Sequence, residues 1–447
     1  MSRFPMRPQN FPETLVWYSI IGTYPIYLLG AQPICSTGLA TVLIGYLIWK
    51  TTLPTEATPV PGRTVPERIQ ISLVAVVWLI ATVVIGLTVF VNAFSLEASR
   101  FDLVKSFLIW YTTWGLMALF PLAGHLPIRP QLIYRASCIL GLQSLIVIAI
   151  GVLGDLAGIA NVGYTSPLNI WLKLAGGAPE QFQVDLLHSP TTRLRLFAVW
   201  PTFLALLGNI HFWLARQEPD PRWRWIGLFT SVLMVLASRS RTATLCLICV
   251  PVLLWFLTHI LRPWVQFGLA ILCCLGGMFA PIWLDGLTLL RDLFDRTRAG
   301  SSAVRATLYR LTINRWWNDA PIWGTGTRDR GPDLVNHLPL GSHQTWLGTL
   351  FSHGIVGLSV LVLAFLWAFI DLFIKAQTSQ LGRVGLSIFL VLVICSFADN
   401  LEFMSYLIYP GLLVLGAAFQ ESYATAPLPT RISSDRFSLN PPNQSSE

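Results

Sequence analysis

The chain has 447 residues, of which 54% are hydrophobic and only 12% are charged, and its formal net charge is +8. Soluble domains carry about 25% charged residues, so this composition excludes an ordinary soluble protein. Several apolar runs reach the roughly 20 residues that cross the core of a bilayer. The sequence therefore predicts an all-α polytopic membrane protein that passes the lipid bilayer many times.

Twelve apolar segments are predicted to span the membrane. They lie at about residues 14–30, 34–49, 69–91, 101–122, 131–153, 196–214, 224–237, 241–258, 264–283, 345–374, 384–399 and 402–419. We expect residues 1–284 to hold about nine N-terminal spans, 285–344 to form a long extracytoplasmic loop with the candidate site, and 345–420 to hold about three C-terminal spans. Residues 50–68 are a Pro/Thr-rich linker, and residues 421–447 are expected to be a disordered cytoplasmic tail.

The distribution of basic residues predicts the orientation, because short cytoplasmic loops are enriched in Lys and Arg. With the N-terminus in the cytoplasm, every predicted cytoplasmic segment holds at least one base. The opposite face should be poor in bases, yet three of its segments contain arginine: 154–195, 238–241 and 285–342, the last with eight arginines. Long loops can cross regardless of their charge. The arginines on this face therefore indicate a site for an anionic substrate.

The long loop is predicted to contain short amphipathic helices. Ser301 or Ser302 can cap a helix that ends near Asn318. Its apolar stripe is Val304, Leu308, Leu311 and Trp316, and the stripe beside it is Arg305, Tyr309 and Thr312. We expect the apolar stripe to lie against the helix bundle and Leu284–Leu293 to form a second such helix.

Five arginines of this face are candidate ligands for a substrate diphosphate: Arg193, Arg195, Arg239, Arg241 and Arg305. Two phosphates need several forked donors, and the guanidinium group supplies them. The alternative is that Arg241 is an interfacial residue whose head reaches water and that the others lie on solvated surfaces. Only four of the 30 basic residues are lysine, which a codon preference for arginine would also explain.

His343 is the candidate general base, because it lies at the entrance of a predicted span and imidazole titrates near neutral pH. The alternative is a structural histidine. His337, inside the loop, is a weaker candidate, and His353 is expected to be a packed helix residue. Asp399 and Glu402 flank a tight turn and are either a second acid–base pair or simply polar turn residues.

The sequence contains no motif for a metal, a nucleotide or another cofactor. Cys246 and Cys249 have CxxC spacing, but they lie among apolar residues without a second pair, so we interpret them as small buried hydrophobic residues. The cytoplasmic loops are too short for a nucleotide-driven enzyme. We expect no cofactor and no nucleic-acid partner, and any reaction would need an already activated substrate.

Three segments resemble motifs of the O-antigen ligase and O-antigen polymerase superfamily. Ser240-Arg241-Thr242-Ala243 resembles the SRxA segment that opens a transmembrane helix. Arg305 followed by Pro321–Gly326 (PIWGTG) resembles the R…PxxGxG segment. Gly341–Leu347 (GSHQTWL), followed by Gly354–Gly357 (GIVG), is similar to the family segment that begins with a histidine and ends in GIVG.

The resemblance covers roughly residues 190–375, and the order and spacing of the motifs make it specific. Gln344 departs from the family pattern, in which Asn or Ser is commoner after the histidine. Arg193 matches a further family arginine, and Arg195 competes for that role. The family pattern agrees with arginine donors for a diphosphate and a histidine near an acceptor hydroxyl.

The resemblance implies an inverting, metal-independent glycosyltransferase of the inner membrane. Such an enzyme takes a glycan from a polyprenyl (undecaprenyl) diphosphate on the periplasmic side. Ligases pass the glycan to a sugar of the lipid A core, completing lipopolysaccharide. Polymerases pass it to another lipid-linked repeat of an O-antigen, capsular polysaccharide or exopolysaccharide. Both share these motifs, so the acceptor stays open.

Two other classes of function are compatible with the sequence. A transporter or flippase of lipid-linked glycan should show broken helices and charged residues near mid-membrane. A non-catalytic assembly protein would leave His343 dispensable. The concentration of charge in one extracytoplasmic loop favours the enzyme.

Overall fold

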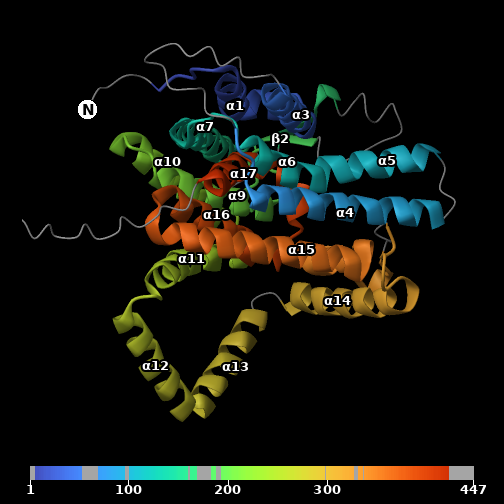
Figure 1. Cartoon of the computed structure of the whole chain (residues 1–447), viewed down its shortest axis with the longest axis vertical. Helices are drawn as coiled ribbons and strands as arrows, with labels where there is room; N and C mark the ends of the chain where they lie inside the picture. Colours follow the sequence, from blue (N-terminus) through green and yellow to red (C-terminus); the bar gives the residue numbers. More distant parts are fainter. Residues whose placement is uncertain are drawn as a thin grey trace, which may run out of the picture.

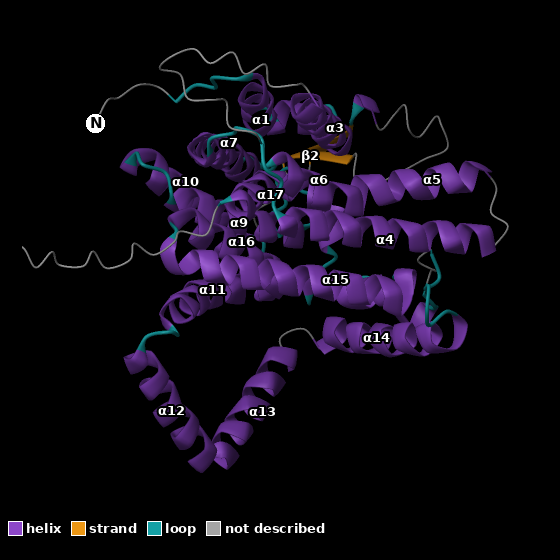
Figure 2. Ribbon diagram, viewed as in Figure 1, coloured by secondary structure: helices purple, strands orange, loops and turns teal. Residues whose placement is uncertain are grey.

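The structure, a computed structural model, is a helix bundle with one small sheet (Figures 1 and 2). It describes residues 6–52, 69–95, 100–159, 162–168, 183–187, 193–296, 299–326, 331–335 and 337–421. The predicted linker beyond residue 52 and the predicted tail beyond residue 421 lie outside the described residues.

The helices account for most of the described backbone. They are α1 Phe11–Ile21, α2 Thr23–Leu28, α3 Gln32–Thr52, α4 Leu73–Ser95, α5 Arg100–Trp110, α6 Leu116–Ala123, α7 Pro130–Leu156, α9 Pro201–Arg216, α10 Pro221–Ala237, α11 Arg241–His259, α12 Pro263–Met278, α13 Ala280–Arg296, α14 Ala299–Asp319, α15 Thr345–Thr378, α16 Gln380–Ser396 and α17 Ser405–Gln420. Short turns of other helix types are η1 Tyr111–Gly115, η3 Asp333–Val335 and η4 Leu401–Met404. Strands β1 Val162–Thr165 and β2 Gln183–Leu187 pair antiparallel, a feature that the all-α prediction did not include.

Seven helices among the described residues are long and apolar enough to cross a membrane, or up to eight if one bent pair counts as a span. Every one of the twelve predicted segments falls on helix, which confirms a polytopic helical protein. The count of twelve is not reached, because α1 and α2 have only 11 and 6 residues, α9, α10 and α16 have only 16, 17 and 17, and the pair α12 and α13 is bent. A straight crossing takes about 20 residues.

The segment predicted as one span at 264–283 is not a straight helix. Helix α12 ends at Met278, and the chain turns by 81° into α13. Pro281, the second residue of α13, lacks the N–H that would continue α12, and proline disfavours helical backbone in the residue before it. The pair forms a V that stands away from the bundle (Figure 1). The predicted boundary at 284/285 and the predicted helix Leu284–Leu293 therefore both lie inside α13.

Helix α17 lies at the centre of the bundle. In the apolar stretch Leu401–Gln420, which contains it, 89% is buried inside the protein. It approaches α6 closely because both helices carry glycine at the contact. A Cβ on Gly416 would stand 1.9 Å from the Pro121 carbonyl oxygen, and one on Gly124 would stand 2.3 Å from the Leu413 carbonyl oxygen. Small residues at such contacts let membrane helices pack backbone against backbone.

The loops sort to the two ends of the bundle as the predicted alternation of sides requires. Contacts between segments predicted to be cytoplasmic are Arg129–Glu13, Gln380–Gln217 and Ser379–Glu421. Contacts between segments predicted to be extracytoplasmic are Arg193–Ser238 and Asn92–Trp323. All of these pairs join segments predicted to face the same side.

Helix α14 lies along α15 and covers its N-terminal part (Figure 1). Leu308, fully buried, packs with Val335, Leu340 and Phe351, and the rest of the predicted apolar stripe packs around them. The predicted stripe is therefore confirmed. The helix begins at Ala299, so it runs through Ser301 and Ser302, and the prediction that either caps it is wrong.

Helix α15 is broken at Gly354, where φ is 64° and ψ is −167°. The segment 321–326 supplies the hydrogen bonds that the break removes. The N–H groups of Thr325 and Gly326 donate to the carbonyls of Phe351 and Ser352, and those of Ile355 and Val356 donate to Pro321 and Ile322, over 2.9–3.3 Å. The long loop is thereby fixed to the broken helix through its backbone.

Replacing Gly354 with alanine should lower the thermal stability of the protein. The new Cβ would stand 2.1 Å from the Ile322 carbonyl oxygen, and alanine disfavours a φ of 64°. A residue held in such a region costs about 1–3 kcal/mol before the clash is counted. The measurement is the unfolding temperature of purified protein in detergent. Gly45→Ala is the control, because nothing lies within 4 Å of its Cβ position. Equal unfolding temperatures for both variants would contradict this account of the break.

Candidate active site

The turn between α16 and η4 is fixed to the start of α15. The Thr345 hydroxyl donates to the Asp399 carbonyl oxygen over 2.9 Å and accepts from the Leu401 N–H over 3.0 Å. The Asn400 side-chain amide donates to the Gln344 carbonyl over 3.1 Å. The position of the Asp399 side chain is thus set relative to the segment that carries His343.

Asp399 lies among side chains from distant parts of the chain. Burial raises the pKa of its carboxyl to about 7, although a hydrogen bond from Thr202 and the guanidinium groups of Arg305 and Arg193 lower it. Thr202 belongs to the first turn of α9, and Arg305 belongs to α14. At neutral pH this carboxyl therefore exists in both its neutral and its charged form.

The polar stripe of α14 faces the same place. The Tyr309 hydroxyl donates to the His343 carbonyl oxygen over 3.4 Å, and the Thr312 hydroxyl accepts from the Gly341 N–H over 3.1 Å. Burial raises the pKa of Tyr309, the Arg305 guanidinium lowers it and the Asp399 carboxylate raises it further. The predicted Arg305, Tyr309 and Thr312 stripe is therefore the face that α14 turns to this site.

His343 lies in a constrained turn just before α15. Its φ is 64° and that of Gly341 is 75°, both in the left-handed region. A non-glycine residue there is uncommon, and such strain gathers at functional sites. His343 is half-buried, and Gln344 is the N-cap of α15. Among the described residues, the buried side-chain oxygens of Ser342 and Gln344 have no hydrogen-bond partner.

Arg193 is held by the turn that ends α10. Its Nε donates to the Ser238 carbonyl over 2.9 Å, and the N–H of Leu194 donates to the Ala237 carbonyl over 3.1 Å. We use the name Arg–Asp cluster for Arg193, Arg305, Tyr309, His343 and Asp399. These residues come from four segments that are far apart in the sequence.

Arg241 is the first residue of α11 and is half-buried. The thiols of Cys246 and Cys395 lie close together and α11 packs on α16, so the start of α11 lies beside the end of α16. Arg241 lies about one helical turn before Cys246 in α11, and Asp399 lies about as far along the chain after Cys395. Arg241 therefore lies at the same end of the bundle as the Arg–Asp cluster.

Three other predicted site residues lie outside the cluster. Arg239 is exposed in the turn before α11, with a φ of 51°. His337 is exposed, and its Nε2 lies 2.6 Å from the Asp333 carboxylate within the loop. Arg195 is half-buried in the segment before α9, where its carbonyl oxygen accepts from the Ala198 N–H over 2.9 Å.

His353 and Glu402 share a cavity that the sequence did not indicate. The cavity has a volume of about 270 Å³ and is lined by both side chains, by Ser352 and by three aromatic residues. Glu402 accepts a hydrogen bond from Asn400 over 3.2 Å. Glu402 and Asp399 thus belong to different sites, not to one acid–base pair. The polar Ser352-His353 pair within an apolar span was the signal that could have located the cavity.

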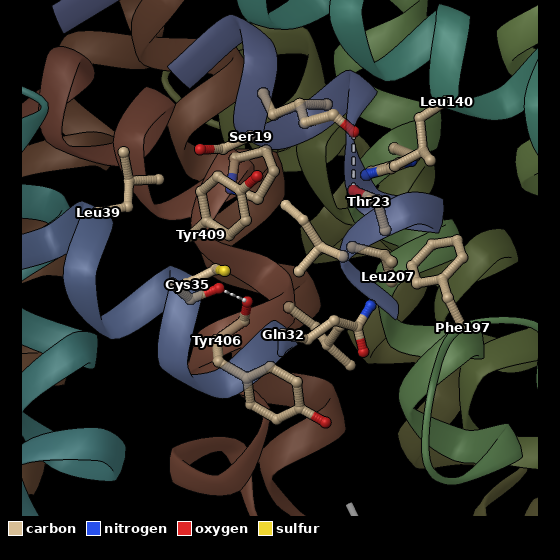
Figure 3. A pocket seen from close by; sticks show the side chains of 16 residues that line it. Ser19, Thr23, Gln32, Cys35, Leu39, Leu140, Phe197, Leu207, Tyr406 and Tyr409 are labelled. Atoms are coloured by element: carbon tan, nitrogen blue, oxygen red, sulfur yellow. Dashed lines mark hydrogen bonds between the residues drawn. The ribbon is translucent and has the colours of Figure 1, made fainter. Parts of the chain in front are cut away.

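A second cavity lies between α1, α2, α3, α7, α9 and α17 (Figure 3). Gln32, His211 and Tyr406 are among the residues that line it. The Nε2 atoms of Gln32 and His211 and the hydroxyl of Tyr406 are buried, and none of them has a hydrogen-bond partner among the described residues. Its volume is about 30 Å³. Such a space admits a water molecule and excludes a sugar ring. It is therefore not the substrate site.

Comparison with known proteins matches residues 226–362 to the family model described as O-antigen ligase. The matched region contains Arg241, Arg305 and His343. The match supports membership of the chain in the O-antigen ligase/polymerase family, as the motifs predict. It also supports a membrane glycosyltransferase-like role in polysaccharide biosynthesis. No curated protein matches the chain.

Asp399 should make the stability of the protein depend on pH. Burial raises the pKa of Asp399 to about 7. The stabilisation of the folded state by its protonated carboxyl is therefore fully present below the pKa of an ordinary Asp and is lost as the pH rises through about 7. Asp399→Asn removes this titration. The unfolding temperature of wild type should therefore fall, relative to Asp399→Asn, between about pH 5 and about pH 8.

The control for this measurement is Asp285→Asn, which changes an exposed carboxylate on α13. The difference in unfolding temperature between Asp285→Asn and wild type should stay constant over the same pH interval. A difference between wild type and Asp399→Asn that is constant with pH would show that Asp399 does not titrate there.

Proposed function

We propose that the chain is a glycosyltransferase that moves a glycan from a polyprenyl diphosphate to an acceptor sugar hydroxyl. We place the reaction at the periplasmic face of the inner membrane, on the basis of the arginine-rich loops of that predicted face. The observation that carries the proposal is the Arg–Asp cluster, in which two arginines and a near-neutral carboxyl come together beside the turn that holds His343. Its His343 and Arg305 lie within the O-antigen ligase match.

The arginines are suited to the diphosphate of the donor. Arg305 and Arg193 lie near Asp399, and Arg241 lies at the same end of the bundle. Forked guanidinium donors stabilise the charge that grows on the diphosphate as it leaves. A bound diphosphate would also favour the protonated form of Asp399, which then donates a hydrogen bond and does not repel the anion. The transfer needs no metal ion in this scheme.

His343 is proposed to accept the proton of the acceptor hydroxyl. The hydroxyl oxygen attacks the anomeric carbon, and the bond from that carbon to the phosphate oxygen breaks with its electrons leaving on the diphosphate. The configuration of the anomeric carbon is thereby inverted. A neutral imidazole suits this role, since its pKa lies near the working pH. Asp399 is the next candidate for the base, because its carboxyl titrates near the same pH.

A transporter of lipid-linked glycan is the second candidate, because the chain contains a span broken by an 81° turn between α12 and α13. At the other break, at Gly354, segment 321–326 fills the backbone hydrogen bonds, so the two sides of the break are tied to the loop. The buried ion pair of Lys375 and Asp371 lies near the opposite end of α15. These features favour the enzyme.

The functions are distinguished by the surface polysaccharide of a deletion strain, analysed on a gel. Full-length polymer that is not attached to its acceptor identifies a ligase, the function that we favour. Single repeats on the lipid carrier identify a polymerase of O-antigen, capsule or exopolysaccharide. Precursor trapped in the cytoplasm identifies a transporter and contradicts the proposal.

His343→Ala should abolish transfer while the protein still inserts and binds its donor. The loss of a positioned base typically lowers the rate about 10²–10⁴-fold. The measurement is the transfer rate of purified protein with lipid-linked glycan as donor. His337→Ala is the matched control, since His337 contacts Asp333 within the exposed part of the loop. A rate for His343→Ala within a few-fold of wild type would move the role of base to Asp399.

Arg305→Lys and Arg241→Lys should each weaken donor binding, because lysine keeps the charge and loses the fork. Loss of a buried charge-assisted contact typically costs about 2–5 kcal/mol. Arg239→Lys is the control, because Arg239 is exposed outside the cluster. The measurement is the KM for the donor in the transfer assay. Wild-type values in both variants would leave these arginines as interfacial residues without a role in donor binding.

A further inference from the structure

We propose that the cavity shared by His353 and Glu402 binds one sugar ring of the acceptor, an inference that rests on the proposed glycosyl transfer. The cavity is formed by the end of α4, by α5 with the π-helical turn η1, by the break in α15 and by η4. It is separate from the Arg–Asp cluster, which is proposed to hold the donor.

The size and lining of the cavity suit a single sugar ring. Its volume of about 270 Å³ is just below the roughly 300–1,000 Å³ of sites for drug-sized ligands. Trp110, Trp114 and Phe403 form apolar walls, and Ser352 and Glu402 add polar groups. A sugar ring has C–H faces that stack on aromatic rings and hydroxyl edges that donate to a carboxylate. A hydrocarbon chain would offer no hydrogen bond to the buried Ser352 hydroxyl, which has no partner among the described residues.

The aromatic walls are held in place before any ligand binds. The Trp110 indole N–H donates to the Thr82 carbonyl over 3.0 Å. Its ring lies against Gly86, where a Cβ would stand only 2.7 Å from the indole. Trp114 makes an edge contact with His353, with ring centroids 6.2 Å apart. Trp114 belongs to η1, and π-helical turns of this kind are frequent at functional sites. Such preorganised walls reduce the ordering cost of binding.

The polar groups of the cavity are buried and oriented. The Ser352 side chain is 5% exposed, and its hydroxyl has no hydrogen-bond partner among the described residues. The Thr88 hydroxyl donates to the Ile85 carbonyl over 2.7 Å, so it accepts from Nδ1 of His353 at 2.9 Å. This places the proton on Nδ1 and the lone pair on Nε2. A buried hydroxyl without a partner points to a polar ligand.

The cavity is connected to the segment that carries the proposed base. The Asn400 side-chain amide lies 3.2 Å from the Glu402 carboxylate and 3.1 Å from the Gln344 carbonyl, one residue after His343. Ser352 also belongs to the backbone contact with segment 321–326. A sugar ring in the cavity would therefore lie beside the segment that holds the general base.

The test separates acceptor binding from donor binding. Glu402→Gln keeps the shape of the side chain and removes its charge, and Ser352→Val removes the hydroxyl and fills part of the cavity. Both should raise the KM for the acceptor about 10- to 100-fold and leave the KM for the donor unchanged. Trp317→Ala is the control, because Trp317 is 69% exposed on α14. An unchanged acceptor KM, or an equal rise in both KM values, would overturn the assignment.

A second measurement detects sugar binding and does not depend on catalysis. Saturation-transfer NMR is recorded on the full chain in detergent with an oligosaccharide released from the surface polysaccharide of the same strain. We expect contact in wild type and in Arg305→Lys, and loss of contact in Glu402→Gln. If the oligosaccharide contacts the wild-type protein but no glycan transfer is measured, the proposed function is contradicted and the sugar site is supported. No contact in wild type, or contact that survives Glu402→Gln, would overturn the sugar site.

Discussion

The arrangement of this end of the bundle depends on the backbone hydrogen bonds between segment 321–326 and the break in α15. The contact needs glycine on both sides. A Cβ on Gly324 would stand 2.4 Å from the N of Gly354, and a Cβ on Gly354 would stand 2.1 Å from the Ile322 carbonyl oxygen. The two glycine-containing motifs of the sequence are therefore two halves of one contact. Through it α14 is fixed along α15, and with α14 come the arginine and the tyrosine of the Arg–Asp cluster.

Local patterns in the sequence predicted correctly which side chains share a face of one helix. The spacing of Val304, Leu308 and Leu311 predicted the buried face of α14, and it placed Arg305 and Tyr309 on the face beside it. The meeting of that face with Asp399 is a tertiary contact. No periodicity records it, because the two are joined only by packing between α14 and the turn after α16. The hydroxyl of Thr202 was missed for the same reason.

Apolar segments were located by composition, but their breaks were not. Mean hydropathy does not register that Pro281 has no N–H to offer, so a bent pair was predicted as one span. The strands β1 and β2 were missed because each is short and gains its stability only from pairing with the other. His353 was predicted to be a packed residue, and its burial agrees with that. What composition could not show is that its neighbours include Glu402 and a cavity of about 270 Å³.

The near-neutral carboxyl of Asp399 explains how an arginine-rich site can exist on its own and still accept an anion. Guanidinium groups that stay charged at every working pH repel one another unless an opposite charge lies close. The ionised Asp399 supplies that charge, but burial holds its pKa near 7, so neutralising it costs little free energy. A permanently charged carboxylate would compete with a diphosphate for Arg305 and Arg193. A permanently neutral side chain would not compensate the charge of either arginine. Within the proposed function, the partly buried carboxyl therefore balances the stability of the empty site against its affinity for the donor.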